Sequence, residues 1–395
     1  MCTSDVLPSE LWLEVFDWAL TPGAECNPYT DAYVPFHAEM DDFERLAMKR
    51  TLNLVCRLWH ALTTELLYRD VVISPKSTHA LHDLLERECK EHPSYGKWVR
   101  RVVLPYTSTV TKSPKPLESV DILKSCPNLE VLVRPPVNTP EPLEFEFEAD
   151  DVAWPSLRRL DWYGHGEAER TGGVNSLHSV LHKAPSLRYL LVGSVGQSGA
   201  APSGVAPGNL CLPHLETLRL DGVNGTLLHQ ICSRWALPAL THVVLDSPAL
   251  GLDIDAVWDA FGDQLEIVEC GRHMRFLFGD VLTPCLGRCP NLEELNYHVF
   301  YTSAPASVEG ICHKGLKTVG LHAAVNKVFS KPAEIWAHLQ SHVDFIVSDA
   351  LPGLKTINLY GQWRGIMRQP AFEAMWKQLV GRRCSIVYNG QILVA

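Results

Sequence analysis

Two hydrophobic periods alternate along most of the chain. Phrases such as CPNLEVLVR at 126–134 and LPHLETLRL at 212–220 place apolar residues two apart, which is typical of a strand buried on one face. The segments before such phrases, among them residues 174–184 and 225–236, place apolar residues three and four apart, as amphipathic helices do. The pattern therefore predicts short helices and short strands in alternation.

The strand phrase is an internal repeat that runs from about residue 97 towards the C-terminus. Most copies place a proline two residues before an anchoring leucine. The anchors are Val99, Leu129, Leu157, Leu187, Leu215, Leu240, Leu265, Leu292, Leu316 and Leu354. Neighbouring anchors are mostly 24–30 residues apart, close to the period of roughly 20–29 residues in leucine-rich repeats, and only the last pair is 38 apart.

This repeat predicts the architecture of most of the chain, because a unit of one helix and one strand cannot bury its apolar face alone. We expect an α/β fold in which an all-helical N-terminal region precedes a leucine-rich-repeat solenoid. The solenoid would be a horseshoe with parallel strands on the concave face and helices on the convex face. The alternative is an ordinary doubly wound α/β domain, although such a sheet does not require a repeated proline–leucine phrase.

Short helical patterns also stand near the N-terminus, at 7–16 (LPSELWLEVF) and 52–62 (LNLVCRLWHAL). Spacings of three and four predict two apolar stripes, formed by Leu11, Val15 and Trp18 and by Leu52, Val55 and Trp59. Helices with so few apolar residues make a small core, so we expect apolar surface to remain exposed for a partner.

These two segments resemble the F-box family. The matching residues are Leu7, Pro8, Glu10, Leu11, Val15, Phe16, Val55, Cys56, Arg57, Trp59 and Leu62. The resemblance implies a substrate-recognition subunit of an SCF-type cullin–RING ubiquitin ligase, which binds a Skp-type adaptor through the F-box and an unknown protein substrate through the repeats. It places the adaptor contacts at Leu7, Pro8, Leu11, Val15, Phe16, Leu52, Val55, Trp59 and Leu62.

The predicted domains are an F-box at 1–74, with an inserted loop at 21–50, and an irregular leucine-rich-repeat solenoid with a C-terminal cap at 75–395. The insertion begins with a stretch rich in proline, glycine and acidic residues, which is typical of an exposed loop, and a helix is expected to resume with DFERLAMKRTLNLVCRLW from Asp42. The alternative is a non-ligase interaction scaffold, whose F-box-like helices only cap the open end of the solenoid.

Substrate contacts are expected on the concave face, where the residues between the buried positions of each strand point outward. That set comprises Asp161, Tyr163, Arg219, Asp221, Asp246, Glu269, Asn296, His298, His322, Asn358 and Tyr360. Its middle is acidic, so we expect a protein substrate with some basic character. The alternative is that these are ordinary solvated strand residues.

Length and charge narrow the class of protein further. A single core stops growing at roughly 250–300 residues, so 395 residues predict two domains or an elongated array. The net charge of −10 disfavours nucleic acid as a partner. The chain has no basic leader and no run of about 18 apolar residues, so we expect no membrane span and a cytoplasmic or nuclear location.

No motif for catalysis, cofactor or metal binding stands out, and we expect a protein that is not an enzyme. The glycine-rich stretch 192–208 lacks the Lys-Ser/Thr ending of a phosphate loop, and the acidic stretch 141–151 is typical of a solvated loop. Cys285 and Cys289 form the nearest pair among twelve cysteines, a weak zinc pattern, so we expect core thiols. The alternative is a metal or nucleotide enzyme, which would bind its metal or nucleotide near Cys285 or at the glycine-rich stretch 192–208.

Overall fold

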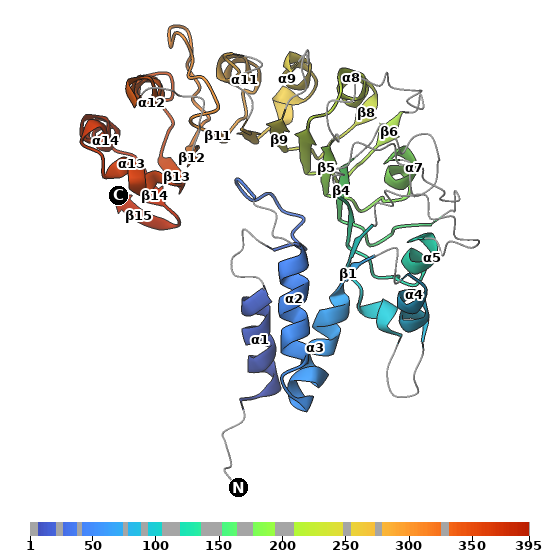
Figure 1. Ribbon diagram of the computed structural model, residues 1–395. Coiled ribbons are helices and arrows are strands. Elements are labelled where there is room, and N and C mark those ends of the chain that lie inside the picture. The colour runs from blue at the N-terminus through green and yellow to red at the C-terminus, as the bar shows by residue number, and fades with distance from the viewer. Residues whose placement is uncertain are drawn as a thin grey trace. The chain divides into compact units, whose positions relative to one another are not determined.

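The structure is a computed structural model (Figure 1). It describes residues 7–20, 27–37, 42–73, 78–87, 94–104, 119–135, 152–163, 177–193, 209–247, 254–272, 279–324 and 332–394. The predicted loops at 141–151 and 194–208 lie outside these residues. The chain forms two compact units, Met1–His214 and Leu215–Ala395, a division that falls inside the predicted repeat region. The domain limits at 1–74 and 75–395 stay a prediction.

The first unit begins with three helices and continues with alternating strands and helices. Its elements are α1 (Ser9–Leu20), α2 (Asp42–Asn53), α3 (Arg57–Arg69), β1 (Asp70–Val72), α4 (Thr78–Glu86), η2 (Tyr95–Trp98), β2 (Arg101–Val103), α5 (Ser119–Lys124), β3 (Val131–Arg134), β4 (Arg159–Tyr163), α7 (Leu177–His182), β5 (Tyr189–Gly193) and β6 (Leu210–Cys211). Strands β1 to β5 pair in parallel, in the order in which they occur in the chain.

The second unit continues the alternation. Its elements are β7 (Thr217–Asp221), α8 (Gly225–Arg234), β8 (Trp235–Ala236), β9 (His242–Ser247), α9 (Asp255–Phe261), η4 (Gly262–Gln264), β10 (Ile267–Cys270), α11 (Leu282–Arg288), β11 (Glu294–His298), β12 (Thr318–Ala323), α12 (Pro332–Val347), β13 (Thr356–Gly361), α13 (Trp363–Met367), η5 (Pro370–Phe372), α14 (Glu373–Gly381), β14 (Ser385–Tyr388) and β15 (Gln391–Val394). Strands β7, β9, β10, β11, β12, β13 and β14 pair in parallel in this order, and β15 pairs antiparallel with β14. Figure 1 shows α8, α9, α11 and α12 along one side of these strands.

The prediction of a mixed α/β fold with a large, mostly parallel sheet is confirmed. In each unit the strands follow chain order without the reversal that defines a doubly wound sheet, so that alternative is wrong. The predicted helices at 174–184 and 225–236 correspond to α7 and α8. The long spacing between the last two anchors reflects α12, a helix of 16 residues.

The anchors explain why the strands form where they do. All ten anchors are buried, and each is followed two residues later by the first residue of a strand. Strand pairing then aligns equivalent positions of neighbouring repeats. Between β9 and β13 this creates a row of paired residues whose side chains are 0% exposed: Val243, Val268, Leu295, Val319 and Ile357. Each row is buried only because its neighbours are present.

The helix expected from Asp42 onward is α2, which begins there, so the loop expected within 21–50 does not extend past Asp42. One prediction about this region is wrong. The segment 52–62 is not one helix, because α2 ends at Asn53 and α3 begins at Arg57. Cys56 is the N-cap of α3, where its Sγ accepts a hydrogen bond from the backbone N–H of Trp59 at 3.5 Å.

Candidate functional site

The three N-terminal helices share a small apolar core, formed by Phe16, Leu20, Leu52 and Leu66. Trp12, Trp59 and Leu62 pack against this core and are partly buried. The Trp59 ring lies 5.0 Å from the Trp12 ring and 4.8 Å from the Phe16 ring, measured between centroids. These distances are those of favourable aromatic pairs, so Trp59 holds α3 against α1.

The opposite side of α1 carries apolar residues that face solvent. Leu11 is 44% exposed, Val15 is 43% exposed and Trp18 is 68% exposed. At 100° per residue these three side chains form one stripe, while Trp12, Phe16 and Leu20 form another that faces the core. The predicted stripe of Leu11, Val15 and Trp18 therefore faces solvent, and the core-facing stripe of α1 is a different one.

The turn between α2 and α3, together with the start of α3, adds further exposed apolar residues. Leu54 is 82% exposed, Val55 is 55% exposed and Leu58 is 42% exposed. Leu7, just before α1, is 43% exposed. Figure 1 shows the start of α1 and the α2–α3 turn at the same end of the packed helices. We call Leu7, Leu11, Val15, Trp18, Leu54, Val55 and Leu58 the apolar helix surface.

The predicted adaptor residues divide between this surface and the core beneath it. The exposed ones are Leu7, Pro8, Leu11, Val15 and Val55. Phe16 and Leu52 are buried in the core, whereas Trp59 and Leu62 pack against it and are partly buried. Sequence reasoning left Trp18, Leu54 and Leu58 out of the site. A signal existed for Trp18, because α1 has more apolar residues than one helix face can bury.

A buried charge cluster joins the helices to the first strand. Asp70, the first residue of β1, lies 3.3 Å from the Nε of Arg45 and accepts a hydrogen bond from Lys49. Burial would raise the pKa of the Asp70 carboxyl, but the charges of Lys49, Arg45 and Arg101 hold it below its usual value. The three helices are thus fixed to the sheet through α2 and α3.

The described part of the insertion, residues 27–37, packs against the strands of the first unit. Arg159 donates a hydrogen bond from Nη1 to the carbonyl of Thr30 at 3.3 Å. Arg188 lies 4.0 Å from the carboxylate of Asp31. The guanidinium of Arg69 lies 5.8 Å from the ring centroid of Tyr29. The segment 27–37 is therefore packed against the rest of the first unit, which corrects the expectation of an exposed loop.

In the first unit the expected outward residues are buried. Asp161 is 5% exposed and forms an ion pair with Arg159 at 2.9 Å. Tyr163 is 8% exposed and packs in a cluster with Tyr189 and Leu191. Their neighbours shield both side chains, so they are not ordinary solvated residues.

In the second unit the outward residues form a paired, partly buried row. Glu269, Asn296 and His298 are buried, whereas Arg219, Asp221, Asp246, His322, Asn358 and Tyr360 are half-buried. Arg219 donates hydrogen bonds from Nε and Nη2 to the two carboxylate oxygens of Asp246. The expected acidic middle is therefore partly neutralised within the chain.

Two histidines of this row lie side by side on neighbouring strands, with their rings tilted at 50° to one another. The rings of His298 and His322 lie 4.4 Å apart, because β11 and β12 pair these residues directly. Burial lowers the pKa of His322 to about 4, and the charge of Arg272 adds to the effect. His322 is therefore neutral at physiological pH and supplies a hydrogen-bonding and stacking group, not a charge.

The cysteine pair of the weak zinc pattern lies in the core, although Cys56, Cys211 and Cys312 are exposed. Cys285 and Cys289 are both 0% exposed. The hydrogen bond between them and their burial raise the pKa of the Cys285 thiol. Within the described ranges, no group of three or more His, Cys, Asp or Glu side chains is arranged to hold a metal ion. Nor does any helix in the described part of the chain have the length and apolar character to cross a bilayer.

No protein-family model matches the chain, and no curated protein matches it. Its function must therefore be inferred from its own residues. The fold and the site define a mixed α/β protein whose N-terminal helices present an apolar surface.

Proposed function

We propose that the protein is an F-box substrate receptor of an SCF-type cullin–RING ligase, with its apolar helix surface bound to a Skp-type adaptor. The observation that carries the proposal is the exposure of Leu11, Val15 and Trp18 on one side of α1, above a core that is complete without them. Exposed apolar clusters of this kind mark interaction sites. The resemblance of 7–16 and 52–62 to the F-box supplies the identity of the partner.

The strand-bearing part of the chain is then a leucine-rich-repeat solenoid that holds the protein substrate. Its support is the buried anchors at a near-constant spacing, each followed by a strand that pairs with the equivalent strand of the neighbouring repeat. Solenoids use the strand side of such an array as an extended binding surface. In this proposal the chain positions the substrate, and the other subunits of the ligase perform the chemistry.

The buried charge cluster at Asp70 favours a second function for the helices, which is to cap the first strand of the sheet. The ion pair with Arg45 and the stacking of Tyr68 on Tyr95 at 4.5 Å join the helices to the strands as a cap would be joined. A cap does not require an apolar outer surface. The alternative of a non-ligase scaffold therefore leaves Trp18 and its neighbours without a role.

The test is the affinity of purified Skp-type adaptor for the full-length chain and for Trp18→Ala, measured by calorimetry. Trp18→Ala should weaken binding by about 2 kcal/mol, or about 30-fold, because interface tryptophans are frequent anchors. The matched control is Ile392→Ala in β15, since Ile392 is 66% exposed and Trp18 is 68% exposed. Thermal unfolding should be unchanged in both variants. Absence of adaptor binding by the wild-type chain, or equal binding by Trp18→Ala, would contradict the proposal.

A further inference from the structure

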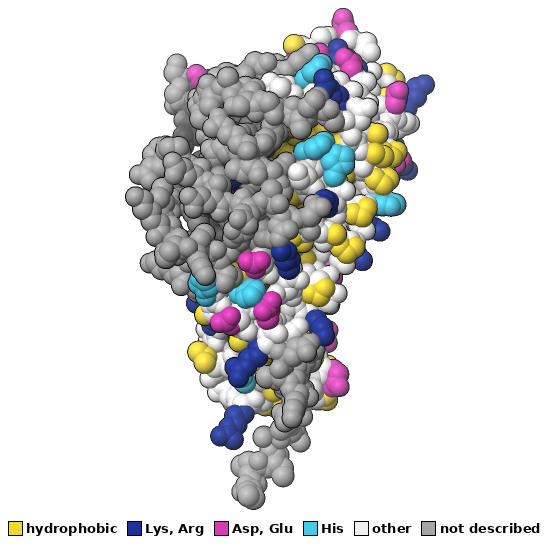
Figure 2. Space-filling view, turned by 90° about the vertical axis from the view of Figure 1, so that its right-hand side faces the viewer, with side chains coloured by type: hydrophobic (Ala, Val, Ile, Leu, Met, Phe, Trp, Pro, Cys, Tyr) yellow, Lys and Arg dark blue, Asp and Glu magenta, His cyan; other side chains and the backbone are white. Residues whose placement is uncertain are grey.

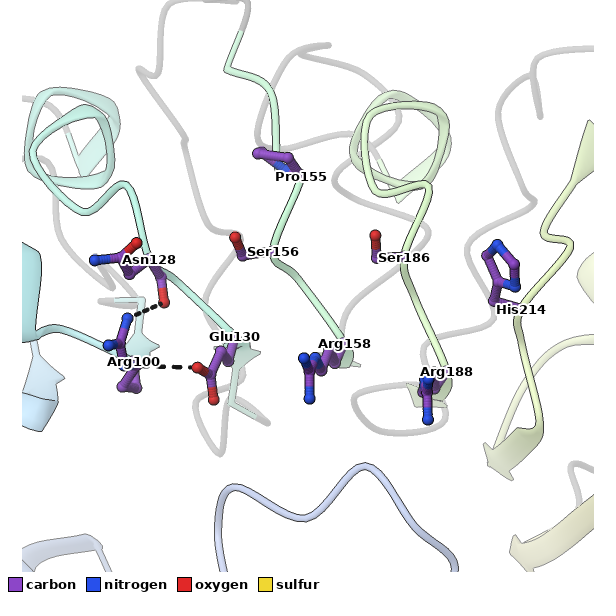
Figure 3. Close-up of a pocket in the computed structure, with 9 residues that line it drawn as sticks. All are labelled: Arg100, Asn128, Glu130, Pro155, Ser156, Arg158, Ser186, Arg188 and His214. Atoms are coloured by element: carbon purple, nitrogen blue, oxygen red, sulfur yellow. Dashed lines mark hydrogen bonds and ion pairs between the residues drawn. The ribbon is translucent and has the colours of Figure 1, made fainter.

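A basic groove lies in the first unit, at the edge where its parallel strands begin. It has a volume of about 420 Å³ and is lined by Arg100, Asn128, Glu130, Pro155, Ser156, Arg158, Ser186, Arg188 and His214 (Figure 3). Three guanidiniums and one carboxylate give this lining an excess of two positive charges with histidine neutral. The whole chain, in contrast, carries a net charge of −10.

The backbone fixes the charged residues of the groove side by side. The amide of Glu130 donates to the carbonyl of Arg100 at 2.8 Å, and the amide of Arg188 donates to the carbonyl of Arg158 at 2.8 Å. Each of these residues stands directly before a strand, so the repeat itself sets their spacing. Neighbouring strands are about 4.8 Å apart, so the groove from Arg100 to Arg188 spans about 14 Å, or roughly four extended residues.

The three arginines are not equivalent. Arg100 donates to the carbonyl of Asn128 at 3.2 Å and lies 3.5 Å from the carboxylate of Glu130, so its charge is largely compensated. Arg158 and Arg188 are exposed neighbours of like charge, an arrangement that costs stability unless an anion is present. The side chain of Arg158 has no ion-pair or hydrogen-bond partner within the described ranges.

The chain itself places a carboxylate at this groove. Asp31, from the segment 27–37, approaches the Nε of Arg188 to 4.0 Å from a position more than 150 residues away in sequence. Guanidinium groups favour carboxylates because their planar N–H donors match the two oxygens. Ser156 and Ser186 are half-buried in the same groove and can hydrogen-bond a peptide backbone. Figure 3 shows both serines above the two arginines.

We propose that this groove binds an acidic peptide segment of a partner protein, with Arg158 and Arg188 pairing with its carboxylates. The proposal goes beyond adaptor binding and does not depend on it, since it uses no residue of α1, α2 or α3. A nucleic acid is disfavoured because the chain as a whole is acidic. Among the coloured side chains of Figure 2, acidic and basic groups are interspersed.

The test is fluorescence anisotropy with the purified full-length chain and a labelled decapeptide of alternating Glu and Gly. Alternate residues of an extended peptide point to one side, which suits a row of arginines. We expect saturable binding at low ionic strength and none to the same peptide with Gln in place of Glu. Arg158→Glu should weaken binding by about tenfold or more, because a charge-assisted contact is replaced by repulsion.

The matched control is Arg364→Glu, an exposed arginine of α13, which should bind the Glu peptide within about twofold of the wild-type chain. Circular dichroism checks that both variants fold, and Arg158→Gln, which only removes the charge, should fall between them. The proposal is overturned if the wild-type chain does not bind the peptide, if Arg158→Glu and Arg364→Glu lose equal affinity, or if a single-stranded oligonucleotide binds more tightly through Arg158.

Discussion

Trp12 and Trp18 stand six positions apart on α1 and lie in opposite environments. Trp12 stacks on Phe16 at 5.7 Å and packs on the helical core, whereas Trp18 is 68% exposed. A fully buried aromatic side chain contributes several kcal/mol to folding. The exposed Trp18 gains none of this free energy in the chain alone and would gain it if a partner covered the ring. This difference between two residues of one type is the basis of the proposed adaptor contact.

The charge of Asp70 gives a pH-dependent prediction at the same scale. The pKa of Asp70 is lower in the folded chain than its ordinary value near 3.8, so the folded state binds fewer protons than the unfolded state around and below that value. Its stabilisation is therefore complete above about pH 4 and is lost as the pH falls through the folded pKa. Asp70→Asn should cost about 3–5 kcal/mol at neutral pH, because it leaves Lys49 and Arg45 buried without their partner.

Thermal unfolding of both proteins between neutral pH and about pH 3 measures this effect. The two melting temperatures should converge as the pH falls below about 4. A difference that stays constant across this range would show that the Asp70 carboxylate does not stabilise the fold through its charge.

At the level of helices and strands, the sequence carried more information about the sheet than about the helices. Each anchor recurs at a near-constant spacing and stands two residues before a strand, so the positions of the strands followed from that spacing. The break between α2 and α3 at residues 54–56 could not be predicted from spacing, because apolar residues three and four apart continue across it. Which side of α1 faces the core did not follow from its pattern, since both of its sides are apolar and the packing of Trp59 selects one.

The outward residues of the strands show the same limit. Alternation predicts that Asp161 and Glu269 point away from the anchors, but it does not predict that they are 5% and 3% exposed. Their burial depends on neighbouring strands, which no single repeat contains, and for Asp161 also on Arg159, two residues earlier in β4. Charge reversal at Glu269 would therefore disturb folding as well as binding. The exposed Arg158 is a better probe of partner capture.

A pair of glycines tests the packing of the strands. A Cβ at Gly320 in β12 would lie 1.9 Å from the Oδ1 of Asn296, which is itself 0% exposed. Gly320→Ala should therefore lower the free energy of unfolding by about 1–3 kcal/mol. At Gly365 in α13 a Cβ meets nothing within 4 Å, so Gly365→Ala should be neutral or stabilise by up to about 1 kcal/mol. Denaturant titration compares the two, and equal effects would contradict the close approach of β11 and β12.

On the scale of the whole molecule, the proposed partners divide between separate surfaces. The apolar helix surface would take the adaptor, while the groove at Arg158 would take an acidic segment of another protein. Removing residues 1–74 is a poor test of this division, because it deletes β1 together with the helices and turns β2 into an edge strand. Point substitutions on each surface separate the two interactions without disturbing the sheet.

Hydrogen–deuterium exchange of the full-length chain, with and without Skp-type adaptor, tests the central claim most directly. The proposal predicts that the adaptor slows exchange in α1 between Leu11 and Trp18 and in the α2–α3 turn around Leu54 and Leu58, while α11 to α14 stay unchanged. Unchanged exchange in α1 and the α2–α3 turn under saturating adaptor, or protection confined to the strands, would contradict it.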